Sequence, residues 1–373
     1  MKIGIITLSA SYNCGSMLQS YALKKIMEKF GDVEIINFSS EASHRMYDIV
    51  PKPYLGKLKM LIKNGKLFRE LCLEKSAYKN FQRTHLHIKG KEFFAKDLPE
   101  ISSKYDIVVA GSDQIWNVCM YDFDDAFFCW WAESKKIAYA PSLGGHSILE
   151  GKEKDKYIKW IKNFDFLSAR ESFGKECLEE ITSTKVTKVL DPTILFGESK
   201  WQKLIKKPLV KGNYIFYYSW AYCDEDSREI VAKRSKDSGL PVYVIDAHKW
   251  IKHSPESAGF ILCKEAGPLA FLNLMYYAKE CYVESFHGML FAYMFKKNFW
   301  LLDTHEHYDA MDQRLKELVK LLNIKDRILT KYNDKSTNKN SDLTYDNNAF
   351  LSEMKRESFL YVKEAILSCS SHI

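Results

Sequence analysis

The sequence predicts an α/β protein with two Rossmann-like lobes. The chain opens with a β-rich run at residues 2–8, an amphipathic run at 17–31 and a second β-rich run at 33–39. This order is the β-α-β unit that builds parallel sheets with right-handed crossovers. The same alternation then returns in two further series. A length of 373 residues with 46% hydrophobic content supports about two domains, each with its own core.

The first lobe is expected to span residues 1–196. Its first helix is predicted because Leu18, Tyr21 and Ile26 recur at helical spacing. The pattern ends at Gly31, a residue that often follows a helix. The later elements are predicted, in order, as strand 105–113, strand 136–142, helix 152–163, strand 165–171, a short helix after Ser172 and strand 185–193.

The second lobe is expected at residues 197–330. Its predicted strands are 213–220, 240–247, 280–285 and 299–303, and its predicted helices are 224–236, 268–279, 289–297 and 311–322. Residues 331–348 are polar and predict a linker, and 349–373 carry apolar residues at helical spacing, which predicts a final helix packed against one lobe. In this class of fold, ligands bind at the carboxyl ends of the strands, so we expect the site in the cleft between the lobes.

Composition and charge narrow the classes of function. Lys and Arg exceed Asp and Glu by 55 − 48 = +7, which does not by itself indicate nucleic acid. The sequence has no run of ~20 apolar residues, and the apolar run at 3–8 is too short for a signal-peptide core. Nine cysteines occur singly, without a C-x-x-C pair. We therefore expect a cytoplasmic protein with reduced thiols and no zinc site.

Residues 52–79 carry most of the basic excess, with eight basic side chains against Glu70 and Glu74. Apolar residues stand between the lysines. This pattern fits peripheral contact with the anionic inner face of a membrane or with a lipid-linked acceptor. The alternative is a solvated helix pair interrupted at Gly56 and Gly65, and this is the more common role of a run of charged residues. Nucleic-acid binding is not expected, because the segment lacks a recognition module.

Four polar motifs stand where predicted strands end. They are Asn13–Ser16, Gly111–Gln114, Ser168–Glu171 and Ser285–Gly288. Loops are polar for solubility alone, but four such motifs that include an Arg and a His favour ligand binding at the strand ends.

The motif Ser285–Gly288 precedes a helix that is apolar on nearly every face. The free N–H groups at the start of such a helix need partners, and an anion is a natural one. Gly288 lets a backbone approach closely, Ser285 can cap the helix or bond a phosphate, and His287 can donate a proton near neutral pH. The alternative is a capped helix with a structural histidine.

Arg170 and Asp113 each allow two interpretations. The guanidinium of Arg170 offers a planar fork that matches a carboxylate or a phosphate, or it forms a surface pair with Glu171. Asp113 follows a run that is expected to be a buried strand. It is either a general base for a hydroxyl or, with Ser112, the cap of the next turn.

Several residues are candidates for contact with a sugar acceptor. Trp116 and Trp220 stand near strand ends, where indoles commonly stack on sugar rings, although core packing is the more frequent role of Trp. His248 lies in the loop 246–267 and is a candidate by position alone. The predicted acceptor or loop contacts are Asn13, Ser16, Ser112, Gln114, Trp116, Asn117, Trp220 and His248.

The motifs resemble, in order, those of the polysaccharide pyruvyl transferase family. The resemblance runs from residue 3 to about residue 327. Its motifs are Tyr12–Gly15 with Leu18–Leu23, Gly111–Asn117, Tyr139–Ser142, Ser168–Glu171, Val189–Thr193, Gly267–Pro268 with Phe271–Leu272, and Ser285–Gly288. No single motif is decisive, but the whole series at this spacing is specific.

The resemblance implies a fold similar to the GT-B glycosyltransferases. It also implies transfer of pyruvate from phosphoenolpyruvate to a sugar of an exopolysaccharide or capsule precursor, as a ketal. Phosphoenolpyruvate is then a co-substrate, and no cofactor or metal is implied. The family associates the donor with the Arg of its S-x-R-E motif and the His of its S-F-H-G motif, which are Arg170 and His287 here.

The resemblance extends the donor-binding set to Ser285, Phe286 and Gly288, and the Asp of the G-S-D motif is Asp113. Glu284 is a departure, because the family usually has Thr, Asp or Asn at that position.

The residues also suit that chemistry on physical grounds. Phosphoenolpyruvate carries a carboxylate and a phosphate, which match the fork of Arg170 and the helix start at Gly288. We expect His287 to protonate the methylene carbon and Asp113 to take a proton from the attacking hydroxyl. Two other classes stay open: a GT-B glycosyltransferase that uses a nucleotide sugar, and a carbohydrate-binding protein without catalytic activity.

Overall fold

The computed structural model describes residues 1–50, 54–251, 254–303, 311–330 and 349–370. The chain divides into two compact units. Unit 1 comprises Met1–Tyr47, Gln82–Phe196 and Ala349–Ile373, and unit 2 comprises Asp48–Phe81 and Gly197–Asn348. The predicted linker at 331–348 lies outside the described residues.

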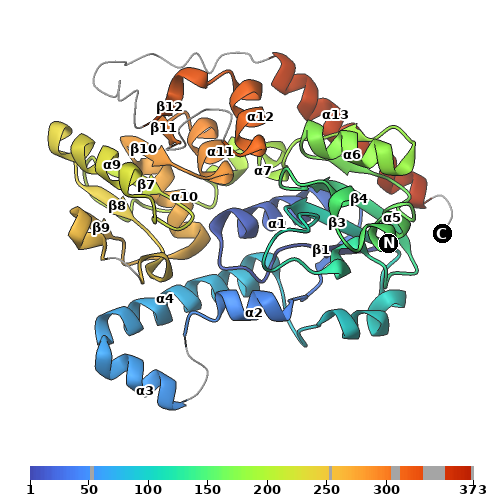
Figure 1. The fold of residues 1–373 in the computed structure, drawn as a ribbon, viewed down its shortest axis with the longest axis horizontal. Coiled ribbons are helices and arrows are strands. Elements are labelled where there is room, and N and C mark those ends of the chain that lie inside the picture. Colours follow the sequence, from blue (N-terminus) through green and yellow to red (C-terminus); the bar gives the residue numbers. More distant parts are fainter. Residues whose placement is uncertain (51–53, 252–253, 304–310, 331–348, 371–373) are drawn as a thin grey trace. The chain divides into compact units, whose positions relative to one another are not determined.

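Over the described residues, unit 1 is built on a four-stranded parallel sheet in the order β2-β1-β3-β4 (Figure 1). The strands are β1 (Lys2–Ile6), β2 (Asp32–Ile35), β3 (Ile107–Asp113) and β4 (Lys135–Pro141). Every residue of β3 is buried, as expected for a central parallel strand covered on both faces. A short parallel pair, β5 (Ser168–Ala169) and β6 (Thr187–Lys188), contacts β4 through β5.

Helix α1 (Cys14–Met27) is the best-covered helix of unit 1. It is buried along nearly its whole length, because it packs against both β3 and α7 (Pro192–Phe196). The other helices are α2 (Glu41–Tyr47), α5 (Lys154–Ile161), α6 (Ser172–Thr182) and α13 (Ala349–Ser370). A π turn at Gln82–Leu86 and 3₁₀ turns at Ala95–Lys104, Asp125–Phe128 and Ile148–Glu150 complete the unit.

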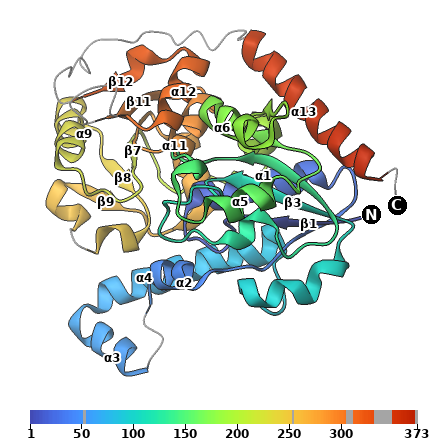
Figure 2. The same ribbon diagram turned by 45° about the vertical axis from the view of Figure 1, so that its right-hand side comes forward.

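The last helix confirms the prediction that the chain closes with a helix packed on one lobe. Helix α13 contacts β4 and α7, and Figures 1 and 2 show it as the red helix that leads to the C-terminus. Its buried stripe includes Met354 and Ile366, which the sequence predicts. The hydroxyl of Tyr361 donates a hydrogen bond to the carbonyl of Ala138 on β4 at 2.8 Å. The helix is therefore tied to the sheet by polar as well as apolar contacts.

Over the described part of the chain, unit 2 is built on a six-stranded parallel sheet in the order β12-β11-β10-β7-β8-β9. The strands are β7 (Ile215–Tyr218), β8 (Val242–Val244), β9 (Phe260–Leu262), β10 (Glu280–Val283), β11 (Asn298–Leu302) and β12 (Ile328–Leu329). The two parallel sheets and their helices confirm the predicted α/β fold with two Rossmann-like lobes.

The helices of unit 2 lie both within the main run of the unit and in the segment Asp48–Phe81. They are α3 (Tyr54–Lys63), α4 (Gly65–Phe81), α8 (Glu198–Gln202), α9 (Glu225–Ser238), α10 (Gly267–Tyr277), α11 (Phe286–Met294) and α12 (Gln313–Leu322). Further 3₁₀ turns lie at Ala247–Trp250, Pro255–Ala258 and Lys325–Arg327. None of the helices in the described residues is long and apolar enough to cross a bilayer.

Residues 48–81 correct the predicted domain boundary, because they belong to unit 2 and not to a lobe that spans 1–196. Helix α4 packs against α10 and the turn Ala247–Trp250. The hydroxyl of Tyr78 on α4 donates to Asp246 Oδ2 at 2.9 Å. The predicted break at Gly65 is correct, since α3 ends just before it, but Gly56 lies inside α3.

Ser358 on α13 provides a test of the helix packing. Its buried Oγ accepts a hydrogen bond from the N–H of Leu190 at 2.9 Å. Ser358→Ala removes this acceptor and should lower the free energy of unfolding by about 1–3 kcal/mol. Chemical denaturation followed by circular dichroism measures the change. Ser352→Ala, at an exposed position of the same helix, should stay within about 0.5 kcal/mol of wild type; equal effects of the two changes would contradict the packing account.

Candidate active site

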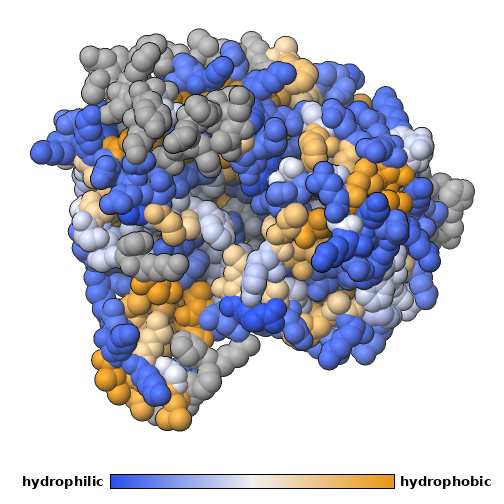
Figure 3. Space-filling view, viewed as in Figure 1, coloured by the Kyte–Doolittle hydropathy of each residue, from blue (hydrophilic) through white to orange (hydrophobic). Residues whose placement is uncertain are grey.

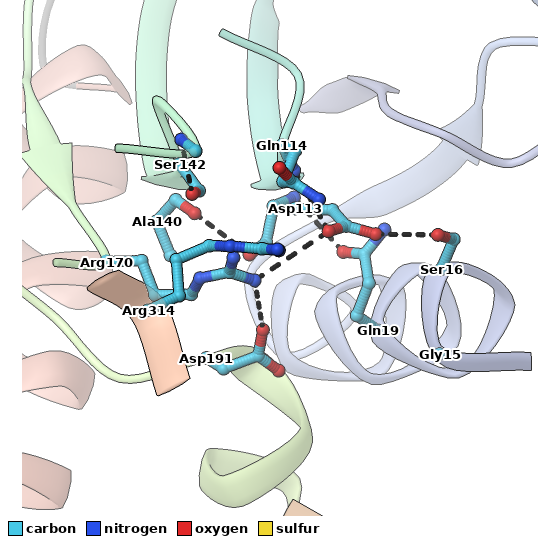
Figure 4. A network of polar contacts seen from close by, with 12 residues as sticks. Gly15, Ser16, Gln19, Asp113, Gln114, Ala140, Ser142, Arg170, Asp191 and Arg314 are labelled. Carbon is cyan, nitrogen blue, oxygen red and sulfur yellow. Dashed lines mark hydrogen bonds and ion pairs between the residues drawn. The ribbon is translucent and has the colours of Figure 1, made fainter. Parts of the chain in front are cut away.

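The carboxyl edge of the unit 1 sheet brings two predicted motifs together (Figure 4). Asn13 caps helix α1, because its Oδ1 accepts hydrogen bonds from the N–H groups of Gly15 and Ser16 at 2.9 and 3.3 Å. Strand β3 ends at Asp113. Parallel strands share one carboxyl edge, so the start of α1 and the end of β3 meet there.

Asp113 is almost fully buried, and both of its carboxylate oxygens are held. Its Oδ2 accepts from the Ser16 hydroxyl at 2.7 Å, and its Oδ1 accepts from the N–H of Gln114 at 2.9 Å. Its φ of +75° lies in the left-handed region, which costs a non-glycine residue roughly 1–2 kcal/mol. Strain of this kind is concentrated at functional sites. The carboxylate thus holds the adjacent turn and stays a candidate base.

Arg170 follows β5 and lies against the same carboxylate (Figure 4). Its Nε donates to Glu171 at 2.6 Å, its Nη1 donates to Asp191 at 3.1 Å, and Nη1 lies 3.8 Å from Asp113 Oδ1. The Arg170 side chain is only 3% exposed, so its pair with Glu171 is buried and not at the surface. Burial alone would lower the pKa of this guanidinium, but the carboxylates of Glu171, Asp191 and Asp113 raise it above its ordinary value.

Other predicted contacts on this edge differ in accessibility. Ser112 is fully buried; its hydroxyl donates to the carbonyl of Ala140 at 2.9 Å, and its N–H donates to Gln19 at 3.2 Å. Ser112 therefore orients the end of β3. Gln114 is half-buried and accepts from the side chain of Asn117 at 2.9 Å. Contact of these side chains with an acceptor stays a prediction.

Trp116 is a core side chain. Its indole is fully buried, its ring packs against Phe128 and Phe164, and its Nε1 donates to the carbonyl of Phe127 at 3.1 Å. A buried indole presents no face to a sugar, so the structure corrects the predicted stacking role of Trp116. Trp220, two residues after the end of β7 in unit 2, is 54% exposed, and its acceptor role stays a prediction.

The turn between β10 and α11 forms the second candidate region, within unit 2. The Ser285 hydroxyl caps α11 by accepting from the N–H of Gly288 at 3.0 Å. A Cβ at Gly288 would stand 2.8 Å from the Ser285 oxygen and 3.2 Å from Tyr218, so the close turn requires glycine. His287 sits in the first turn of α11 and is 8% exposed. The predicted cap is confirmed, and the donor roles of Ser285, Phe286 and His287 stay predictions.

Glu284 precedes this turn and is held by the neighbouring strand. It accepts hydrogen bonds from the hydroxyls of Tyr217 and Ser219, the latter at 2.6 Å. Burial raises the pKa of Glu284, although these hydrogen bonds oppose the rise. Sequence reasoning missed Tyr217 and Ser219. The available signal was their spacing, because residues two apart in a strand point to the same face.

The turn after β8 carries His248, which the sequence singled out. The N–H of His248 donates to Glu74 Oε2 at 3.0 Å, and its Nδ1 contacts the other oxygen of that carboxylate. Burial raises the pKa of Glu74. His248 therefore ties this turn to α4, and its contact with an acceptor stays a prediction.

Lys249 is a buried cation that sequence reasoning missed. Its Nζ donates to the carbonyl of Ser219 at 3.2 Å and lies 3.4 Å from Asp246 Oδ2. The same ammonium lies 4.4 Å from the centre of the Tyr218 ring. A single lysine in a loop gives no pattern in the sequence, because its partners come from the ends of other strands.

These two parallel sheets, with polar motifs at their carboxyl edges, define an α/β protein of the GT-B type. The family model for polysaccharide pyruvyl transferase matches residues 13–306, which is most of the chain. The chain therefore belongs to the polysaccharide pyruvyl transferase family. A search of the curated proteins found no match.

Solved structures share the fold at low sequence identity. S. aureus MnaA with UDP aligns with a TM-score of 0.53 at 11% identity, over 96% of this chain and 92% of that chain. The UDP-GlcNAc 2-epimerase from Neisseria meningitidis bound to UDP-GlcNAc aligns with a TM-score of 0.51 at 10% identity, over 99% of this chain and 100% of that chain. At this identity, the likeness shows the fold alone.

Glu284 predicts a pH-dependent contribution to stability. Its raised pKa means that the folded state holds the proton more tightly than the unfolded state, whose ordinary value is 4.5. Wild type should therefore lose stability relative to Glu284→Gln as the pH rises from the ordinary value through the raised pKa. Urea denaturation of both proteins between about pH 4 and about pH 8 measures this difference.

Glu229→Gln, at an exposed position of α9, is the control. The difference in free energy of unfolding between this variant and wild type should stay constant over the same pH range. A stability difference between Glu284→Gln and wild type that does not change with pH would contradict the buried-carboxylate account.

Proposed function

We propose that the protein transfers pyruvate from phosphoenolpyruvate to a sugar of a surface-glycan precursor, forming a ketal. The observation that carries the proposal is the position of Asp113, Arg170 and His287, each at the carboxyl end of a strand, in a chain that belongs to this family. Phosphoenolpyruvate acts as a co-substrate without a further cofactor. A carbohydrate acceptor, free or lipid-linked, and a cytoplasmic location belong to the same proposal.

The donor carries a carboxylate and a phosphate, and the two candidate regions offer a match for each. Arg170 has the planar fork that suits a carboxylate, and the N–H groups at the start of α11 suit a phosphate. Of the three carboxylates described around Arg170, Asp113 is the most distant, at 3.8 Å. A donor carboxylate that replaces this contact leaves the Asp113 carboxylate available to accept a proton from the acceptor hydroxyl.

The first step is protonation of the donor. His287 gives a proton to the methylene carbon, and the electron pair of the carbon–carbon double bond forms the new carbon–hydrogen bond. The neighbouring carbon, which carries the phosphate ester oxygen, becomes oxocarbenium-like. Solvent returns a proton to His287 at the end of the cycle.

The second step joins the acceptor. A sugar hydroxyl attacks the oxocarbenium-like carbon while Asp113 takes the proton of that hydroxyl. The bond from this carbon to the phosphate oxygen then breaks, and phosphate leaves with the electron pair. A second hydroxyl of the same sugar attacks the same carbon and releases its proton, which closes the ketal ring.

Arg170→Lys keeps the positive charge but loses the fork, so it should weaken phosphoenolpyruvate binding by about tenfold or more. Isothermal calorimetry measures the dissociation constant. Arg234→Lys is the matched control, because its guanidinium also forks onto a carboxylate, that of Glu280 at the start of β10. Equal losses of affinity in the two variants would contradict a donor role for Arg170.

His287→Ala should abolish phosphate release in the presence of acceptor glycans while changing the donor dissociation constant by less than about threefold. The reason is that the proposed proton transfer occurs after the donor has bound. His146→Ala, at an exposed position, should leave both quantities unchanged. A loss of donor binding in His287→Ala as large as that in Arg170→Lys would contradict the division of roles.

Nucleotide sugars in the same calorimeter test the alternative function. Tight binding of a nucleotide sugar, together with no binding of phosphoenolpyruvate, would favour a GT-B glycosyltransferase.

A further inference from the structure

Helix α3 carries an apolar stripe that is exposed to solvent. Leu55, Leu58 and Ile62 are 68%, 40% and 78% exposed. Their spacing of three and then four residues places them on one face of the helix. Figure 3 shows hydrophobic side chains gathered at the surface over α3 and α4.

The stripe is not the face that holds α3 to the rest of unit 2. Among the α3 side chains that the structure describes, Met60 joins the apolar cluster with Val50, Phe68 and Leu71. Residues two apart in a helix lie about 200° apart around its axis, so Ile62 points away from the side that Met60 occupies. The packing of α3 on α4 therefore leaves the stripe uncovered.

Lysines flank the stripe. Lys57 and Lys59 are both exposed, and each lies about 100° around the helix from Leu58, one on either side. Lys63 is exposed in the last turn, and α3 contains no acidic residue. An apolar stripe between cationic edges is the pattern of helices that lie in a membrane interface, because long lysine side chains reach the headgroups while the stripe enters the acyl boundary.

We propose that α3 is a membrane-docking helix, whose stripe of Leu55, Leu58 and Ile62 enters the interface of an anionic bilayer. Lys57, Lys59 and Lys63 pair with lipid phosphates. A second copy of this chain is the competing occupant. In a two-fold interface the same patch faces itself, so lysines would face lysines, whereas an anionic lipid surface complements them.

This inference does not rest on the proposed pyruvyl transfer, because vesicle binding needs neither donor nor acceptor. Failure of one proposal therefore leaves the other intact. Where both hold, docking by α3 brings the enzyme to acceptors that are carried on lipid.

The test is flotation of the full chain with vesicles in which about a third of the lipid is phosphatidylglycerol and the rest is phosphatidylcholine. Wild type should float with these vesicles and not with pure phosphatidylcholine. The combined change Leu55→Ser, Leu58→Ser and Ile62→Ser should weaken binding by at least about tenfold.

A charge variant and a control complete the design. Gln in place of Lys57, Lys59 and Lys63 should weaken binding by about fivefold per lysine and reduce its sensitivity to salt. Leu360→Ser with Leu367→Ser changes two exposed leucines of α13, which are 38% and 52% exposed, and should float as wild type does. Circular dichroism checks that every variant is folded.

Equal flotation of wild type and the stripe variant would overturn the proposal, and so would equal binding to both kinds of vesicle. Light scattering measures whether the chain forms a dimer in solution. A dimer that the stripe variant abolishes, in a protein that does not bind vesicles, would assign the stripe to a second copy of the chain.

Discussion

The buried guanidinium of Arg170 is the interaction on which the carboxyl edge of unit 1 depends. It joins Asp113 at the end of β3, Glu171 beside it and Asp191 at the start of α7. Carboxylates are costly to bury unless a cation and hydrogen bonds compensate them. Removing one partner of such a buried network typically costs about 3–5 kcal/mol, so the chain cannot change this side chain without disturbing the strand ends it connects.

The same contacts also orient the side chains that are candidates for catalysis. The Asp113 carboxylate is pre-oriented, because the Ser16 hydroxyl, the N–H of Gln114 and a more distant contact with Arg170 hold it. Unit 2 also buries a carboxyl group at the end of a strand, but it compensates that group in another way. There Ser285 caps an apolar helix, and the carboxyl group of Glu284 accepts hydrogen bonds from the hydroxyl groups of Tyr217 and Ser219. The carboxylates at the first edge are thus held by a shared cation, whereas Glu284 at the second edge is held by hydroxyl donors.

Local patterns predicted much of the fold. Fully buried parallel strands appear in the sequence as runs of apolar residues, and helices appear as apolar residues at helical spacing. These patterns could not predict contacts between distant segments. The placement of residues 48–81 in unit 2 rests on pairs such as Tyr78 with Asp246, which lie far apart in the sequence. At the site, the motifs predicted that Arg170 follows a strand and that Ser285 caps a helix. The burial of Trp116 depends on the ring packing of the folded core, which a position near a strand end does not reveal.

The most direct measurement of the central claim is mass spectrometry of acceptor glycans after incubation with the protein and carbon-labelled phosphoenolpyruvate. We predict that a glycan gains the whole carbon skeleton of pyruvate without phosphorus, in an acid-labile ketal, and that inorganic phosphate appears in equal amount. A glycan that gains nothing from phosphoenolpyruvate, but gains a sugar when a nucleotide sugar is supplied, would contradict it.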